Sequence, residues 1–151
     1  MKYFTIAWWM GETDDESHDP VTIYRERVAS IKSMIPDSLT MYIEEISLHD
    51  SKIKEIDVNI PERRIRISTT TWDKGGSEIL NILQYDGVER YASCADYKKG
   101  LPGPHGYGDW GYDEIDIDKN GLLSHRILFS SGITIDITFK IFSFSEQSFH
   151  I

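Results

Sequence analysis

Cysteine is almost absent from the chain: Cys94 is the only one among 151 residues, which excludes an internal disulfide and a cysteine-based zinc site. A chain so poor in cysteine is typical of a reducing compartment, and we therefore expect a cytoplasmic location. Long apolar runs are also missing. Nothing approaches the ~20 apolar residues that a membrane-spanning helix needs, and the acidic segment after the short run 3–10 has no secretory cleavage pattern. We therefore expect no membrane association.

Basic side chains are the minority of the charged residues, with 16 Lys and Arg against 25 Asp and Glu and a formal charge of −9. Such a chain repels nucleic-acid phosphates, so we expect no nucleic-acid partner. The acid gathers in two runs, Glu12, Asp14, Asp15, Glu16 and Asp19, then Asp109, Asp113, Glu114, Asp116 and Asp118. These runs are either solvated surface or a docking face for a basic protein.

The length and the 40% hydrophobic composition predict a single domain over residues 1–151, with two helices near its start. Asp19 followed by Pro20 is typical of an N-cap and a first helical residue. The apolar stripe of this helix consists of Tyr24, Val28, Ile31 and Ile35. A second, shorter helix is expected to begin at Asp37 and to end at residues 48–50.

Strand patterns follow the helices. Residues 56–67 alternate between apolar and polar side chains on both sides of a turn, which predicts a hairpin. The earlier segment Tyr3–Met10 is rich in aromatic and β-favouring residues but has neither period. It favours an edge strand over a first helical turn.

The alternation is clearest from Trp110 to Phe142. With three-residue loops at 119–121 and 130–132, one face carries Ile115, Ile117, Leu123, Ile127, Phe129, Ile133, Ile135, Ile137, Phe139 and Ile141. The same register places Glu114 opposite Arg126. The side chains that it directs to water are Asp116, Asp118, Asp136 and Lys140. Two helices followed by about six antiparallel strands predict an α+β fold, with both helices on one face of a meandering sheet.

Two short motifs suggest metal chemistry, and each has a simpler interpretation. Asp116, Asp118 and Asn120 match the first half of a calcium-binding loop, but Ile127 stands where a glutamate is needed, and a hairpin turn uses the same residues. His49-Asp50 resembles a metal dyad of hydrolases. The alternative is a structural junction, in which Leu48 anchors in the core, His49 bonds a carbonyl and Asp50 fixes the turn between helices and sheet.

A candidate partner-binding surface surrounds the loop 100–108, where six of nine residues are glycine or proline. Its residues are His105, Tyr107, Asp109, Trp110, Tyr112 and Asp113. Aromatic side chains beside acid are enriched at protein interfaces. The alternative is that Trp110 and Tyr112 simply cover one end of the sheet. His125, on the apolar face, is expected to be a buried residue that bonds a carbonyl or a tyrosine.

Seven short motifs follow one another along most of the chain. They are Tyr3-Phe4-Thr5, Trp8-Trp9, Ile35-Pro36, Leu48-His49-Asp50, Gly111-Tyr112-Asp113-Glu114, His125-Arg126-Ile127-Leu128 and Ser131-Gly132. In them the chain resembles a loose group of small bacterial proteins of unknown function, some of which resemble immunity proteins encoded beside polymorphic toxins. The loop 100–108 and the turn 116–121 have no counterpart in this pattern. The resemblance implies no catalytic residues.

These features predict a non-enzymatic, cytoplasmic protein-binding domain, resembling an immunity protein that neutralises a basic toxin. One alternative is a small metal-dependent hydrolase that uses His49, Asp50 and a carboxylate from Asp109 or Asp113. Another is a structural domain. We expect no cofactor, and the sequence does not indicate an oligomeric state.

Overall fold

The computed structural model describes residues 1–13, 19–103 and 105–149, and these ranges contain three α-helices and eight strands. The helices are α1 (Ile6–Trp9), α2 (Pro20–Ile31) and α3 (Asp37–Glu45), with a 3-10 turn η1 (Lys32–Met34) before α3. The strands are β1 (Lys52–Asn59), β2 (Arg64–Trp72), β3 (Glu78–Asp86), β4 (Arg90–Cys94), β5 (Trp110–Ile117), β6 (Leu123–Phe129), β7 (Thr134–Phe139) and β8 (Ile141–Ser148).

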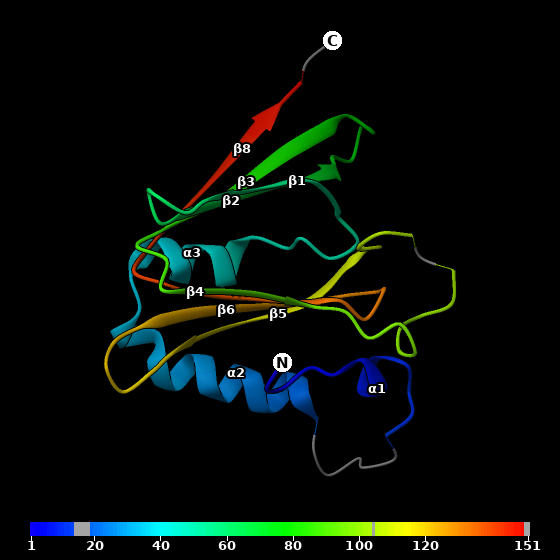
Figure 1. The fold of residues 1–151 in the computed structure, drawn as a ribbon, viewed down its shortest axis with the longest axis horizontal. Helices are drawn as coiled ribbons and strands as arrows, with labels where there is room; N and C mark the ends of the chain where they lie inside the picture. The colour runs from blue at the N-terminus through cyan, green and yellow to red at the C-terminus, as the bar shows by residue number, and fades with distance from the viewer. Residues whose placement is uncertain (14–18, 104, 150–151) are drawn as a thin grey trace.

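The strands form two four-stranded sheets, in the orders β1-β2-β3-β8 and β4-β7-β6-β5, and every pair is antiparallel. Figure 1 shows the first sheet above the second. The α+β class and the antiparallel pairing are therefore confirmed. The expectation of one meandering sheet with about six strands is wrong, because the chain crosses from one sheet to the other twice.

The two crossings lie side by side and make a corner. Asp86 of β3 pairs with Ile141 of β8, whereas Arg90 of β4 pairs with Thr138 of β7, so one extra residue lies on the β3–β4 side. Strands that switch sheets commonly turn through such a bulge. The bend also ends the apolar alternation: Ile141, expected on the buried face, is 62% exposed.

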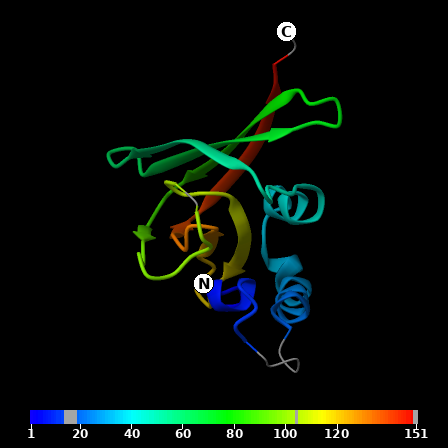
Figure 2. The same cartoon turned by 90° about the vertical axis from the view of Figure 1, so that its right-hand side faces the viewer.

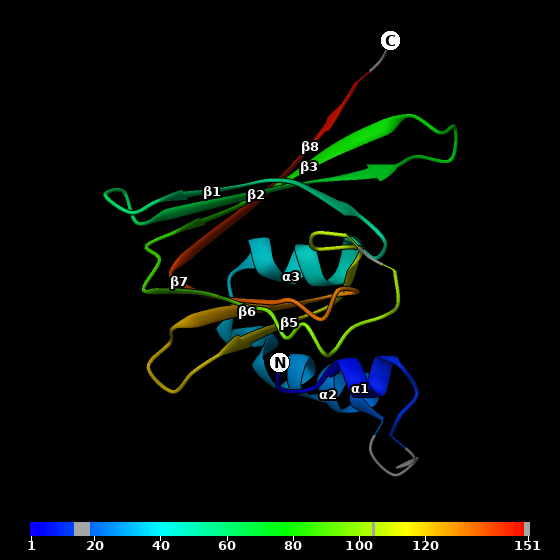
Figure 3. The same cartoon turned by 45° about the vertical axis from the view of Figure 1, so that its right-hand side comes forward.

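Helices α2 and α3 cover different faces, which corrects the expectation that both pack on one face. Helix α3 lies between the sheets and contacts β8, while α2 lies beneath the second sheet and contacts β5 (Figures 1 and 3). Because the two helices lie on opposite sides of it, the second sheet is covered on both faces near β5.

The N-cap of α2 is as predicted, since the Asp19 carboxylate accepts the Val21 N–H at 3.2 Å.

The segment Tyr3–Met10 does not form the expected edge strand. Residues Ile6–Trp9 make one helical turn, whose first N–H groups are capped by Thr5 through a 3.2 Å bond from Trp8. Figure 2 shows this turn below the second sheet, beside α2. The segment is held by aromatic packing, with the Phe4 and Tyr112 rings stacked 5.1 Å apart, and not by strand pairing.

One hydrophobic cluster joins both sheets to α3. Leu39 of α3, Ile67 and Leu83 of the first sheet, and Ile127 and Phe139 of the second are all fully buried. None of the helices in the described ranges has the length and apolar character needed to cross a membrane.

Candidate functional site

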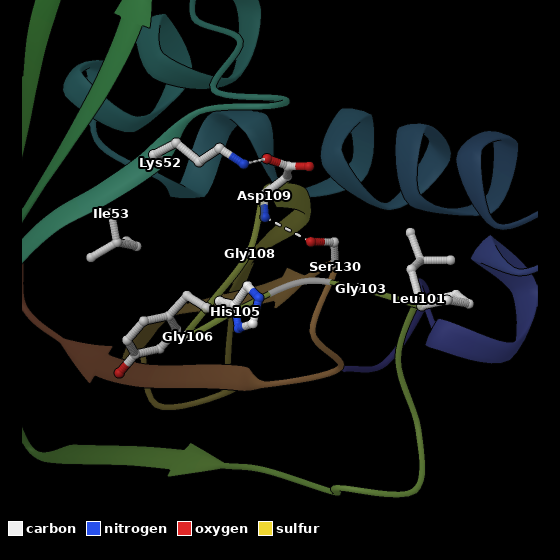
Figure 4. A pocket seen from close by; sticks show the side chains of 11 residues that line it. Lys52, Ile53, Leu101, Gly103, His105, Gly106, Gly108, Asp109 and Ser130 are labelled. Atoms are coloured by element: carbon white, nitrogen blue, oxygen red, sulfur yellow. Dashed lines mark hydrogen bonds and ion pairs between the residues drawn. The ribbon is translucent and has the colours of Figure 1, made fainter.

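The loop between β4 and β5 encloses a cavity of about 700 Å³ against the first residues of β1 (Figure 4). Lys52 contributes the β1 side and forms an ion pair with Asp109. His105 and Tyr107 line the loop side, and Ser130 lines the floor. The structure thus brings together three of the predicted partner-binding residues, His105, Tyr107 and Asp109.

This loop is tied to the turn between β6 and β7. Leu101 N–H donates to the Ser130 carbonyl at 2.8 Å, and Asp109 N–H donates to the Ser130 hydroxyl at 2.7 Å. Gly100, with φ of +132°, lies so close to the turn that a Cβ would be 2.4 Å from the carbonyl oxygen of Ser131. Glycine is therefore required at position 100 both for its backbone angle and for the close approach.

The other three predicted partner-binding residues lie elsewhere. Trp110 is 1% exposed and belongs to the core, which agrees with the alternative that this residue covers the sheet and not with a place in the candidate partner-binding surface. Its neighbour Gly111 forms a bulge in β5, after which Tyr112 and Asp113 point to opposite faces of the sheet. Tyr112 and Asp113 both line a second cleft, of about 470 Å³.

This second cleft, which we call the joint cleft, is formed where four segments meet. Its lining residues are Phe4, Tyr24, Ile46, Ser47, Leu48, His49, Gly111, Tyr112 and Asp113. They come from the N-terminal segment, from α2, from the link between α3 and β1, and from β5. Because β5 is the last strand of its sheet, its backbone at 111–113 forms one wall.

The link between α3 and β1 is fixed to β5 on both sides of His49. Leu48 is 3% exposed and packs in the core. Asp50, with φ of +66°, donates its N–H to the Trp110 carbonyl at 2.8 Å. His49 Nδ1 lies 2.8 Å from the Gly111 carbonyl oxygen and donates to it, because a carbonyl can only accept. These bonds hold the helical layer to the sheet at the residues that the sequence marks as a junction.

The Trp9 ring packs closely against β5 at Gly111, one of the residues that line the joint cleft. A Cβ at Gly111 would lie 2.3 Å from the Trp9 ring, which no side chain could tolerate without displacing the ring. The ring centroids of Trp9 and Tyr112 are 5.3 Å apart at an interplanar angle of 89°. Gly111 therefore allows the α1 aromatic side chains to cover this edge.

A buried hydrogen-bonded chain reaches the cleft from the core. The Tyr42 hydroxyl donates to Asp113 Oδ2 at 2.7 Å, and His125 Nε2 donates to the same oxygen at 2.6 Å. The Tyr85 hydroxyl lies 2.7 Å from His125 Nδ1. Since an ionised carboxylate only accepts, Nε2 carries a proton, and the hydrogen bond at Nδ1 is shared with the Tyr85 hydroxyl, which can donate or accept.

These hydrogen bonds and the burial of the residues account for the pKa shifts of Asp113, Tyr42 and Tyr85. Burial opposes ionisation of Asp113, but hydrogen bonds from His125 and Tyr42 hold the pKa of its carboxyl below the ordinary value. Burial first, and then the nearby Asp113 charge, raise the pKa of Tyr42 and of Tyr85. The expected buried histidine bonded to a tyrosine is thus confirmed, with His125 fully buried.

On the opposite face of β5, Glu114 is fully buried and holds the N-terminal segment. Its carboxylate accepts the backbone N–H groups of Lys2, Tyr3 and Phe4 at 2.6 to 3.2 Å. The predicted pairing with Arg126 is confirmed, because Arg126 Nε donates to Glu114 Oε2 at 2.8 Å.

Asp116, expected in water, is 7% exposed beneath α2. It accepts from Arg27 Nε at 3.0 Å, and Arg126 Nη2 lies 3.4 Å from its other oxygen. Two of the five residues of the second acidic run are therefore internal, because Glu114 and Asp116 are neutralised by arginines and cannot serve as a docking face. Of the first run, Asp14, Asp15 and Glu16 lie outside the described residues.

Acid should weaken the fold through Asp113 and Asp116. Burial opposes ionisation of Asp116 as well, but hydrogen bonds from the Ile117 N–H and from Arg27 lower its pKa. Both pKa values lie below those of the unfolded chain, so this stability is fully present above about pH 4 and is lost as the pH falls further. Urea unfolding between about pH 6 and pH 2 should show this loss. The loss should be smaller in Asp116→Asn; an equal loss in both proteins would contradict the assignment.

The motif 116–121 forms the predicted hairpin turn between β5 and β6. Asp118 Oδ1 accepts the N–H groups of Asn120 at 2.8 Å and Leu122 at 2.9 Å, and Gly121 has φ of +80°. The Asp116 carboxylate is already bonded to Arg27 and lies close to Arg126. In the described part of the chain, no three His, Cys, Asp or Glu side chains are grouped so that they could hold a metal ion.

The sequence did not single out several residues of the two cavities. Phe4, Tyr24 and Ser47 line the joint cleft, while Lys52 and Ser130 line the loop cavity. The aromatic richness of the first ten residues was the available signal for Phe4, whereas Ser47 carries no local signal. Comparison with known proteins adds no assignment, since no family model and no curated protein matches the chain.

Proposed function

We propose that the chain is a non-enzymatic cytoplasmic protein-binding domain of a bacterium, and that it neutralises a basic protein partner in the manner of an immunity protein. The observation that carries this proposal is the pairing of the basic side chains within the protein, which leaves an excess of exposed acidic ones. Most lysine and arginine side chains are already engaged in ion pairs within the chain, such as Lys54 with Glu78 and Arg63 with Glu89.

Acid predominates among the remaining exposed charges, although Arg66, Lys74, Lys98 and Lys119 are exposed as well. Exposed carboxylates include Glu12, Glu26, Asp37, Glu45 and Asp57, and the formal charge of the chain is −9. A surface of this kind attracts a basic protein from a distance and disfavours an acidic one. The joint cleft supports the proposal further, because it offers aromatic rings beside a carboxylate, the chemistry enriched at protein interfaces.

The test is co-expression with the C-terminal domain of a toxin encoded beside the gene of this chain. We expect a complex that survives purification at about 0.05 M salt and weakens at about 0.5 M, because salt screens charge-driven association. An acidic toxin domain of similar size serves as the control. Failure to bind the neighbouring domain or any other basic domain at low salt would exclude the proposal.

A further inference from the structure

The joint cleft has an unusual combination of walls for a surface hollow. Aromatic rings of Phe4, Tyr24 and Tyr112 line it from the side of the N-terminal segment and α2. Its inner wall is Asp113, whose side chain is 27% exposed although it sits on the core-facing side of β5. Phe4 is buried and stacked on Tyr112, so the accessible aromatic surface beside the carboxylate belongs to the half-buried rings of Tyr24 and Tyr112.

The side-chain hydrogen bonds that hold Asp113 in the fold are made by one of its two carboxylate oxygens. Oδ2 accepts from both Tyr42 and His125. Within the described ranges, no well-formed hydrogen bond reaches Oδ1, although the buried indole N–H of Trp110, which has no other partner, lies near enough to help lower the pKa of the carboxyl. A carboxylate can accept about four hydrogen bonds, so Asp113 can still accept a further donor. No lysine or arginine in those ranges forms an ion pair with Asp113, because Arg27 and Arg126 are held on the opposite face by Glu114 and Asp116.

The rim adds negative charge to the same place. Glu45 and Asp50 bracket the lining segment 46–49 in the chain, and both are exposed. His49 lines the cleft as well, with its Nδ1 already bonded to Gly111. A volume of about 470 Å³ leaves room for one long side chain. The shape and the charge therefore select a cationic group.

We propose that the joint cleft binds the side chain of an arginine presented by the basic protein partner. The planar guanidinium lies against the accessible parts of the Tyr24 and Tyr112 rings and donates to the Asp113 carboxylate. Arginine fits better than lysine, since a guanidinium stacks on aromatic faces and donates in a fixed plane, whereas an ammonium is a compact, strongly hydrated charge. This inference rests on the proposed function and names the position on the surface at which the partner is recognised.

The test uses two tripeptides, acetyl-Gly-Arg-Gly-amide and its lysine counterpart, titrated into the ¹⁵N-labelled chain. Addition of the arginine peptide should shift the amide signals of Ser47, Gly111 and Tyr112 with a dissociation constant on the order of 1 mM. The lysine peptide should bind several-fold more weakly. Equal binding of both peptides, or shifts confined to other surfaces, would overturn the inference.

Two variants with the same charge change complete the test. Ser47 is exposed and lines the cleft, so Ser47→Arg places a guanidinium of the chain itself in the site and should abolish peptide binding. Ser93, exposed on β4, provides the control Ser93→Arg, which should bind as the unmodified chain does. If a basic toxin domain binds the chain while the peptide shifts are absent, the cleft assignment fails and the proposed function stands.

Discussion

Replacing Glu114 by alanine is expected to lower the free energy of unfolding by about 4 kcal/mol, since removing one partner of a buried ion pair leaves the other charge unpaired. The only carboxylate contact left to Arg126 in the described ranges would be the longer one of 3.4 Å to Asp116. The three N–H groups of residues 2–4 would lose their common acceptor. Urea unfolding measures the loss, and limited proteolysis should cut the N-terminal segment faster.

The matched control is Glu26→Ala, which removes an exposed carboxylate from α2. It should change the free energy of unfolding by no more than about 0.5 kcal/mol, as most surface substitutions do. A loss at Glu114 no larger than that at Glu26 would show that the buried carboxylate does not hold the N-terminal segment in place.

The second large effect is expected at His125. Replacement by leucine fills most of the space but leaves the buried Tyr85 hydroxyl without its hydrogen-bond partner and removes a donor from Asp113. Buried polar groups left without partners cost about 1–3 kcal/mol each, so we expect a loss of about 3 kcal/mol in the free energy of unfolding.

A double-mutant cycle separates this cause from simple repacking. Tyr85→Phe alone removes the hydroxyl that is hydrogen-bonded to His125, and it should destabilise the protein by about 1–2 kcal/mol. In the His125→Leu background the same change should cost nothing, because the hydroxyl no longer has a hydrogen-bond partner to lose. Equal costs of Tyr85→Phe in both backgrounds would contradict the described hydrogen-bonded chain.

Local patterns in the sequence predict the pairing of neighbouring strands but not the arrangement of layers. Alternation from Trp110 onward fixes the register of β5 and β6, and the structure has Glu114 opposite Arg126 as expected. The pattern cannot reveal that α2 covers the polar face of these strands. Asp116 is therefore read as solvated, although Arg27 from α2 neutralises it in the interior.

The alternation also failed to predict the corner between the two sheets, for a similar reason. Phe139 and Ile141 continue the alternation without a break, yet the bulge belongs to the partner strand near Gly87, about fifty residues away along the chain. The apolar residues Phe142 and Phe144 at even positions were the available local sign that the buried face changes there.

The candidate site was predicted only where its residues are close in sequence. His105, Tyr107 and Asp109 share one loop and do line one cavity. The joint cleft, in contrast, combines Phe4 with Ser47 and Asp113, three positions whose proximity follows from the packing of both helices around β5. The periodicity of a single sequence indicates local structure and carries no information on contacts between distant segments.

The affinity of a basic partner domain for three forms of the chain tests the account most directly. Titration calorimetry would compare the unmodified chain with Ser47→Arg and Ser93→Arg, which carry the same net charge. Recognition through the joint cleft predicts that Ser47→Arg weakens binding by at least about tenfold, roughly 1.4 kcal/mol, and that Ser93→Arg changes it by much less. Equal weakening by both variants would mean that overall charge alone drives association, which contradicts the cleft as the recognition site.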